Sequence, residues 1–134
     1  MQHQYDDGGR AAAGFKGDAR DCAVRAIAIA TGQDYRAVYD EINRIGKKHG
    51  SRSRTGVFRE TVDEYLRGLG WTWTPTMKVG AGCSVHLRSD ELPTGNLVVR
   101  CSRHFAAVID GVLRDTFDSS RGGTRCVYGY WRPA

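Results

Sequence analysis

The sequence predicts an α+β domain in which N-terminal helices pack on an antiparallel β-sheet. Apolar residues recur with a period of about 3.6 in the first half of the chain and about 2 in the second. Aspartate and glycine stand where helices begin and end, and the second half is rich in β-branched and aromatic residues. Helices followed by a run of strands are typical of this fold class.

The first predicted helix covers residues 22–31, "CAVRAIAIAT". It is apolar on nearly every face except at Arg25, which is the pattern of a helix buried all round. Asp21 is a favourable N-cap residue and Gly32 a favourable stop signal. We therefore expect this helix to lie in the centre of the domain, with Cys22 in its first turn.

The other elements follow from the same two periodicities. Further helices are predicted over 35–46, capped by Asp34, and from about 57 to 70. Strands are predicted at 71–74, 96–102, 104–109, 112–118 and 126–131, and residues 76–95 form a predicted loop with a short strand near 84–87.

Length and composition indicate one globular domain over residues 1–134. Apolar residues make up 40% and charged residues 26% of the chain, close to the average for globular domains. The number of residues, 134, suits a single hydrophobic core. The polar segment 1–9 is the one place where we expect disorder.

No membrane span or secretory leader is recognisable in the sequence. No apolar run reaches the roughly 18 residues of a membrane-spanning helix, and the first twenty residues lack the apolar core of a signal peptide. We therefore expect a cytoplasmic protein with no membrane partner, in which cysteine thiols are free. The four cysteines are Cys22, Cys83, Cys101 and Cys126.

A hairpin in the second half brings two polar residues together. In "HFAAVIDGVLRDTFD", Asp110-Gly111 separates two apolar runs and is typical of a tight type I′ turn. The turn pairs Ile109 with Val112, and alternation then puts His104 and Asp115 on one face. As diagonal neighbours they lie about 7 to 8 Å apart at the backbone, within reach of each other's side chains.

Cys22, His104 and Asp115 together suit nucleophilic catalysis. The reactive form of cysteine is the thiolate, and the start of a helix favours that form through its partial positive charge. An imidazole can take the thiol proton, while a carboxylate orients the ring and stabilises its charged form. The three residues occur in the order Cys, His, Asp.

Two segments resemble the papain-like cysteine peptidase superfamily. "RDCAVRAIAIATG" is similar to its nucleophile helix, and "HFAAVIDGVLRDTFD" to the hairpin that carries the histidine and its orienting Asp or Asn. The spacing resembles compact members, namely bacteriocin-leader-processing peptidases and cell-wall amidases. The resemblance implies a papain-like fold and cofactor-free hydrolysis of a peptide, amide or isopeptide bond, with Cys22, His104 and Asp115 as the catalytic triad.

The chain departs from that family beside the cysteine. Many members place a Gln several residues upstream to complete the oxyanion hole with the cysteine N–H group, but residues 16–21 here contain no side-chain amide. Lys16 or Arg20 could supply the second donor. The amidases also follow the cysteine with Ser-Gly, where this chain has Ala23-Val24.

A structural zinc site is the first alternative. Two Cys-x-x-His pairs offer four ligands for a tetrahedral ion, namely Cys83, His86, Cys101 and His104. The two pairs lie in different predicted secondary structure, one in a loop and one at a strand end.

The second alternative is a papain-like binding or assembly protein without turnover. The net charge is +5, and six basic residues gather between 44 and 59. Such a stretch can bind an acidic substrate or partner, or nucleic acid, although no interleaved aromatic residues support base stacking. The six are Arg44, Lys47, Lys48, Arg52, Arg54 and Arg59.

Overall fold

A computed structural model describes residues 1–78 and 80–134, and this part of the chain forms an α+β fold. The helices are α1 (Cys22–Thr31), α2 (Tyr35–Gly46) and α3 (Arg59–Gly68). The strands are β1 (His3–Tyr5), β2 (Trp71–Pro75), β3 (Asn96–Cys101), β4 (His104–Ile109), β5 (Val112–Asp115) and β6 (Gly129–Pro133).

The predicted helices and most predicted strands are confirmed, with shifted ends. The first helix covers the predicted residues, and the carboxylate of Asp34 caps α2 by accepting from the Ala37 N–H at 3.2 Å. The last two strands differ most, because β5 stops at Asp115 and β6 starts only at Gly129. The expected short strand near 84–87 is a single β-bridge, between His86 and Cys126.

The sheet is mixed, whereas a purely antiparallel one was predicted. Its strand order is β1-β5-β4-β3-β6-β2, and β1 runs parallel to β5. The expectation of disorder over residues 1–9 is wrong for β1, which pairs His3 with Leu113 and Tyr5 with Asp115. The physical reason is that β5 otherwise ends the sheet with unpaired backbone groups, which polar residues can satisfy as well as apolar ones.

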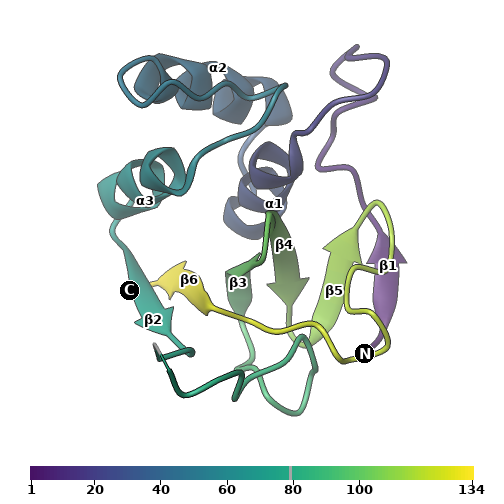
Figure 1. Cartoon of the computed structure of the whole chain (residues 1–134). Coiled ribbons are helices and arrows are strands. Elements are labelled where there is room, and N and C mark those ends of the chain that lie inside the picture. The colour runs from purple at the N-terminus through teal and green to yellow at the C-terminus, as the bar shows by residue number, and fades with distance from the viewer. Residues whose placement is uncertain (79) are drawn as a thin grey trace.

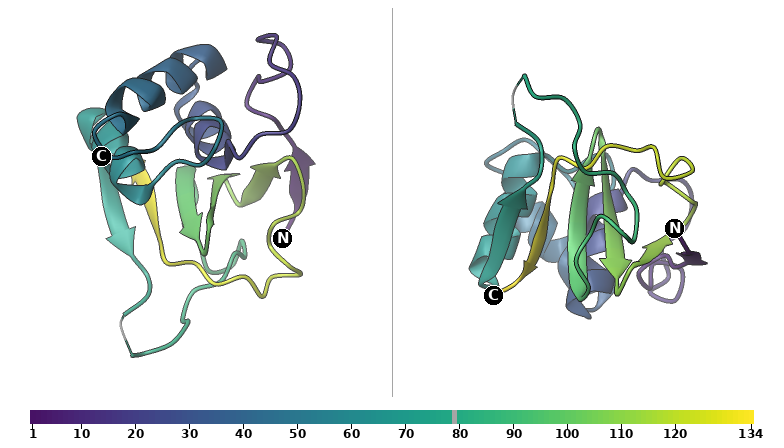
Figure 2. Two further views of the ribbon diagram at one scale, coloured as in Figure 1. Left: turned by 45° about the horizontal axis from the view of Figure 1, so that its top comes forward. Right: turned by 90° about the horizontal axis from the view of Figure 1, so that it is seen from below.

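The three helices form a layer on one side of the sheet (Figures 1 and 2). α1 packs on the central strands β3 and β4, α3 packs on β2, and α2 packs on α1 and α3. One core cluster joins the helices to Val98, Phe105, Ala107 and Trp131 of the sheet. This packing explains why α1 is apolar on almost all sides.

The opposite face of the sheet is covered by connecting segments. A second core cluster joins Leu97, Ala106 and Val108 to Leu87 and Leu92 of the segment between β2 and β3. Figure 1 shows this segment and the chain before β6 crossing below the strands. Leu87 and Leu92 thereby help to bury this face of the sheet.

A disulfide joins the two covering segments, in contrast to the expectation that all four thiols are free. Cys83 is bonded to Cys126 with a Cα–Cα distance of 5.8 Å, whereas Cys22 and Cys101 are free. Backbone hydrogen bonds bring the segments together, because Leu87 N–H donates to Arg125 and Val127 N–H donates to Val85. Spacing in the sequence does not reveal this pairing.

No helix among the described residues is long and apolar enough to cross a membrane.

Candidate active site

The hairpin between β4 and β5 has the predicted register. Ile109 pairs with Val112 and Ala107 with Arg114, as the Asp110-Gly111 turn requires. Both turn residues have positive φ, 48° and 79°, which is the type I′ signature. The predicted placement of His104 and Asp115 follows from this register.

His104 and Asp115 are hydrogen-bonded to each other. The distance from His104 Nε2 to Asp115 Oδ2 is 2.7 Å, and both side chains are buried. Asp115 also accepts from the Ser119 hydroxyl at 2.9 Å and from the Thr116 N–H at 2.8 Å. The carboxylate is therefore held on several sides and fixes the plane of the imidazole.

Cys22 is the first residue of α1 and lines the same cavity as His104. Burial raises the pKa of Cys22, but the hydrogen bond with His104, the charge of His104 and the Phe105 N–H lower it below its ordinary value. Burial lowers the pKa of His104, but hydrogen bonds with Asp115 and Cys22 raise it to about 9. The opposite directions of the two shifts favour a thiolate–imidazolium pair.

The pKa of Asp115 is lowered, which complements the raised pKa of His104. Burial raises the pKa of this carboxyl, but the hydrogen bond and charge of His104, with those of Ser119 and Thr116, hold it below the ordinary value. Asp115 is therefore ionised across the pH range in which His104 changes its charge.

The three side chains meet where the ladder between β4 and β5 ends. Alternation places His104 and Asp115 on the sheet face away from α1, the face that buries Ala106 and Leu113. The paired part of the two strands stops at Ala107 and Arg114, however, so both polar residues lie just beyond it. There the start of α1 comes within reach of them.

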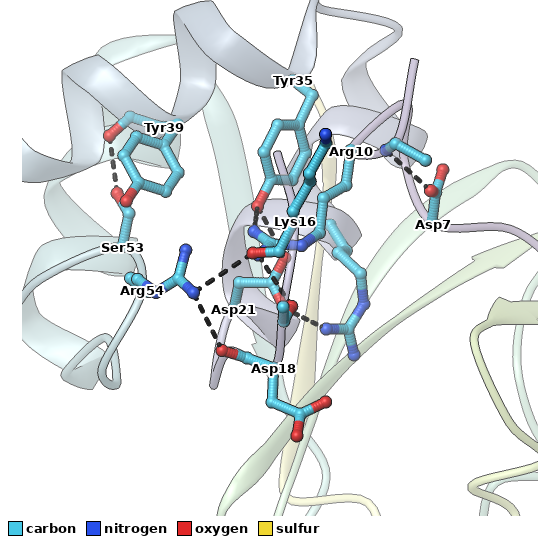
Figure 3. A network of polar contacts seen from close by, with 12 residues as sticks. Asp7, Arg10, Lys16, Asp18, Asp21, Tyr35, Tyr39, Ser53 and Arg54 are labelled. Carbon is cyan, nitrogen blue, oxygen red and sulfur yellow. Dashed lines mark hydrogen bonds and ion pairs between the residues drawn. The ribbon is translucent and has the colours of Figure 1, made fainter. Parts of the chain in front are cut away.

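Asp21 has a different role from the predicted N-cap. It occupies the N-cap position, but its side chain makes no capping hydrogen bond. The buried carboxylate instead accepts from Tyr35 Oη at 2.6 Å and pairs with Arg25 and, at 3.6 Å, with Arg10 (Figure 3). The first N–H groups of α1 therefore have no side-chain cap from Asp21.

Tyr35 completes this buried network. Its hydroxyl donates to Asp21 and accepts from Arg10 Nη1 at 2.8 Å. Burial and the Asp21 carboxylate raise the pKa of Tyr35 well above its usual range. The network ties the segment before α1 to α2, and so fixes the place where α1 begins.

Arg25 is the residue that sequence reasoning passed over. It lies one turn after Asp21, and its Nη2 is 3.4 Å from Asp115 Oδ1 while Nη1 bonds Asp21. Its side chain is 11% exposed, so the two carboxylates share a largely buried cation. The signal available in the sequence was a single charge in an otherwise apolar helix.

The four residues of the zinc hypothesis are not gathered into one site. Cys83 is bonded to Cys126, and His86 Nδ1 lies 3.2 Å from Glu91 Oε1. Cys101 is buried, and burial raises its pKa to about 11. Within residues 1–78 and 80–134 no group of three or more His, Cys, Asp or Glu side chains is placed to hold a metal ion.

Part of the basic stretch is already neutralised. Arg44 pairs with Glu41, and Lys48 Nζ lies 2.6 Å from Glu64. Arg54 donates to the carbonyl groups of Lys16 and Asp18 (Figure 3). Arg59 differs from these, because it lines the cavity beside Cys22.

A cavity of about 1020 Å³ opens beside Cys22 and His104. Its walls come from the start of α1, the segment leading into α3, the β3–β4 turn and Phe117, and they include Cys22 and His104. The cavity offers room for a substrate of several residues at the thiol.

Comparison with known proteins finds no matching family model, no similar curated protein and no similar solved structure.

Proposed function

We propose that the protein is a thiol-dependent hydrolase of papain-like architecture, acting on a peptide, amide or isopeptide bond. Cys22 is the nucleophile, His104 the general base and acid, and Asp115 the residue that orients the imidazole. The observation that carries the proposal is the position of His104, which bonds Asp115 and lines one cavity with Cys22. Asp115 occupies Nε2, which leaves Nδ1 to act on the Cys22 thiol.

The reaction would proceed in two steps. The Cys22 thiolate attacks the carbonyl carbon, and the His104 imidazolium gives its proton to the leaving amine, so that a thioester forms as the C–N bond breaks. Neutral His104 then takes a proton from water, whose oxygen attacks the thioester. The acid is released and the thiolate and imidazolium are restored.

The developing oxyanion needs hydrogen-bond donors near Cys22. The first turn of α1 supplies backbone N–H groups there, since the Asp21 side chain bonds elsewhere. Of the two side chains considered for the second donor, Arg20 lines the cavity and Lys16 does not. We assign the second donor to Arg20 on this basis.

The decisive measurement is the pH dependence of Cys22 alkylation. In the wild-type protein we expect an apparent pKa below the roughly 8.5 of an ordinary thiol, and a return to or above that value in His104→Ala. His86→Ala is the matched control, because His86 also contacts a carboxylate but lies away from the cavity. An ordinary pKa in all three proteins would refute the proposal.

Turnover is tested with a library of peptide, amide and isopeptide substrates. Cys22→Ala is expected to abolish hydrolysis. Cys101→Ala should leave the rate of hydrolysis unchanged, because buried Cys101 keeps its proton at neutral pH. Hydrolysis that survives Cys22→Ala would contradict the assignment of the nucleophile.

A further inference from the structure

The cavity beside Cys22 has strongly basic walls. Five arginine side chains and only two carboxylates line it. The arginines are Arg20, Arg25, Arg59, Arg100 and Arg103, and the carboxylates are Asp21 and Glu60. A largely positive cavity raises the local concentration of negatively charged ligands.

The two carboxylates neutralise only part of this charge. Asp21 pairs with Arg25 and Arg10, so it offsets Arg25 but not Arg20, Arg59, Arg100 or Arg103. Glu60 lies 3.8 Å from Arg59, with both side chains more than half exposed, and such surface pairs contribute little.

Arg100 is held in place by aromatic rings. Its guanidinium carbon lies 5.0 Å from the ring centre of Trp73 and 5.9 Å from that of Tyr128. Stacking uses the faces of a guanidinium and leaves the N–H groups at its edge free to donate. Within the described residues the Arg100 side chain makes no ion pair or hydrogen bond.

Arg59 and Arg100 line the same cavity, so their like charges repel each other. Burial and the charge of Arg59 lower the pKa of Arg100, although half-buried Asp63 opposes the effect. A carboxylate bound between the two guanidinium groups would relieve the repulsion and accept paired hydrogen bonds from them.

We propose that Arg59 and Arg100 form a subsite for an acidic side chain, Glu or Asp, next to the bond that Cys22 attacks. The inference rests on the proposed function and gives its substrate class as acidic peptides. Nucleic acid fits less well, because the cations gather within one cavity while Arg44 and Lys48 outside it are paired with carboxylates.

The first test compares two alkylating reagents that differ in charge. Iodoacetate carries a carboxylate and iodoacetamide does not, so the ratio of their rates at Cys22 reports the field of the cavity. Arg59→Gln and Arg100→Gln are each expected to lower that ratio about fivefold. Arg132→Gln is the matched control, an exposed arginine outside the cavity, and should leave it unchanged.

Peptide mapping assigns the modification to Cys22 rather than Cys101. An unchanged ratio in both the Arg59 and the Arg100 variants would overturn the subsite. Exposed Arg59 can be replaced without loss of packing, so the test survives if the Arg100 variant fails to fold. The ratio can be measured even for an ordinary thiol, so failure of the subsite and failure of the catalytic proposal are distinguishable.

The second test measures binding to the Cys22→Ala protein. A blocked, fluorescein-labelled glutamyl peptide is expected to bind at least fivefold more tightly than its glutaminyl analogue, and Arg59→Gln should remove the difference. Equal binding of the two peptides would overturn the proposal. So would tighter binding of a short single-stranded oligonucleotide that depends on Arg59, which would make the cavity a nucleic-acid site.

Discussion

Arg25 of α1 reaches Asp115 of β5, with Nη2 3.4 Å from Oδ1, and thereby links the helix of the candidate nucleophile to the carboxylate behind the candidate base. Its other nitrogen bonds Asp21, so one cation serves two buried carboxylates. A largely buried cation between two anions contributes mainly when both partners remain in place.

Arg25→Gln is therefore expected to lower the free energy of unfolding by about 3 kcal/mol, because two buried carboxylates each lose one of their charged partners. It should also raise the apparent pKa of Cys22, since Arg25 is one of the charges that lower it. Arg25→Lys keeps the positive charge and should therefore restore part of the lowering of the Cys22 pKa. Chemical denaturation and alkylation profiles measure the two effects.

The control for this prediction is Arg36→Gln. Arg36 is exposed and stacks on Phe15, with its guanidinium carbon 4.6 Å from the ring centre, and it lies outside the cavity. A Cys22 pKa that does not move in Arg25→Gln would reduce Arg25 to a purely structural residue.

Asp115→Asn tests the source of the raised His104 pKa. The amide can still accept a hydrogen bond, but the charge that stabilises the imidazolium is lost. The pKa of His104 should fall from about 9 toward its ordinary value of about 6.5. The alkaline limb of hydrolysis should move to lower pH with it, because the imidazolium that protonates the leaving amine is lost sooner.

The His104 titration can be followed by NMR of its ring protons. Asp118→Asn is the matched control, since Asp118 is also an aspartate of this segment but bonds Ser120 instead. If the pKa of His104 stays near 9 in Asp115→Asn, the carboxylate is not what stabilises the charged ring.

The sequence was most informative where a local pattern determines geometry. The apolar run after Asp21 predicted α1, and the Asp110-Gly111 turn fixed the hairpin register, so the contact between His104 and Asp115 could be anticipated. Both depend on periodicity and turn chemistry, which are properties of neighbouring residues.

Contacts between distant segments were not accessible in the same way. The parallel pairing of β1 with β5 has no turn to mark it, and the bond between Cys83 and Cys126 depends on how two connections cross the sheet. Asp21 has the residue type of an N-cap, but Tyr35 and two arginines compete for its carboxylate. Such competition is decided by tertiary packing, which a single sequence does not display.

Tyr35→Phe tests the buried network before α1. The substitution keeps the ring and removes the hydroxyl that donates to Asp21 and accepts from Arg10. Leaving those buried groups short of a partner should lower the free energy of unfolding by about 1 to 3 kcal/mol. Thermal and urea denaturation measure the loss.

Tyr39→Phe is the matched control for that substitution. Tyr39 packs against the same Phe15 ring, at 4.7 Å between ring centres, and among the described contacts its hydroxyl makes no hydrogen bond. Removing the Tyr39 hydroxyl should lower the free energy of unfolding less than removing the Tyr35 hydroxyl. Equal effects of the two substitutions would mean that the Tyr35 hydroxyl adds nothing beyond its ring.

The Cys83–Cys126 disulfide is expected to stabilise the covering segments of the sheet. It closes a loop with a sequence separation of 43 residues, and the chain-entropy model assigns such a loop about 4 kcal/mol. The Cys83→Ser, Cys126→Ser double variant should therefore unfold at lower urea concentration than the oxidised wild type. A reducing agent should lower the wild-type midpoint to that of the variant and leave the variant unchanged, which separates the effect of the bond from that of the substitutions. A wild-type midpoint insensitive to reduction would show that the segments are held by the Leu87 and Val127 backbone hydrogen bonds without help from the disulfide.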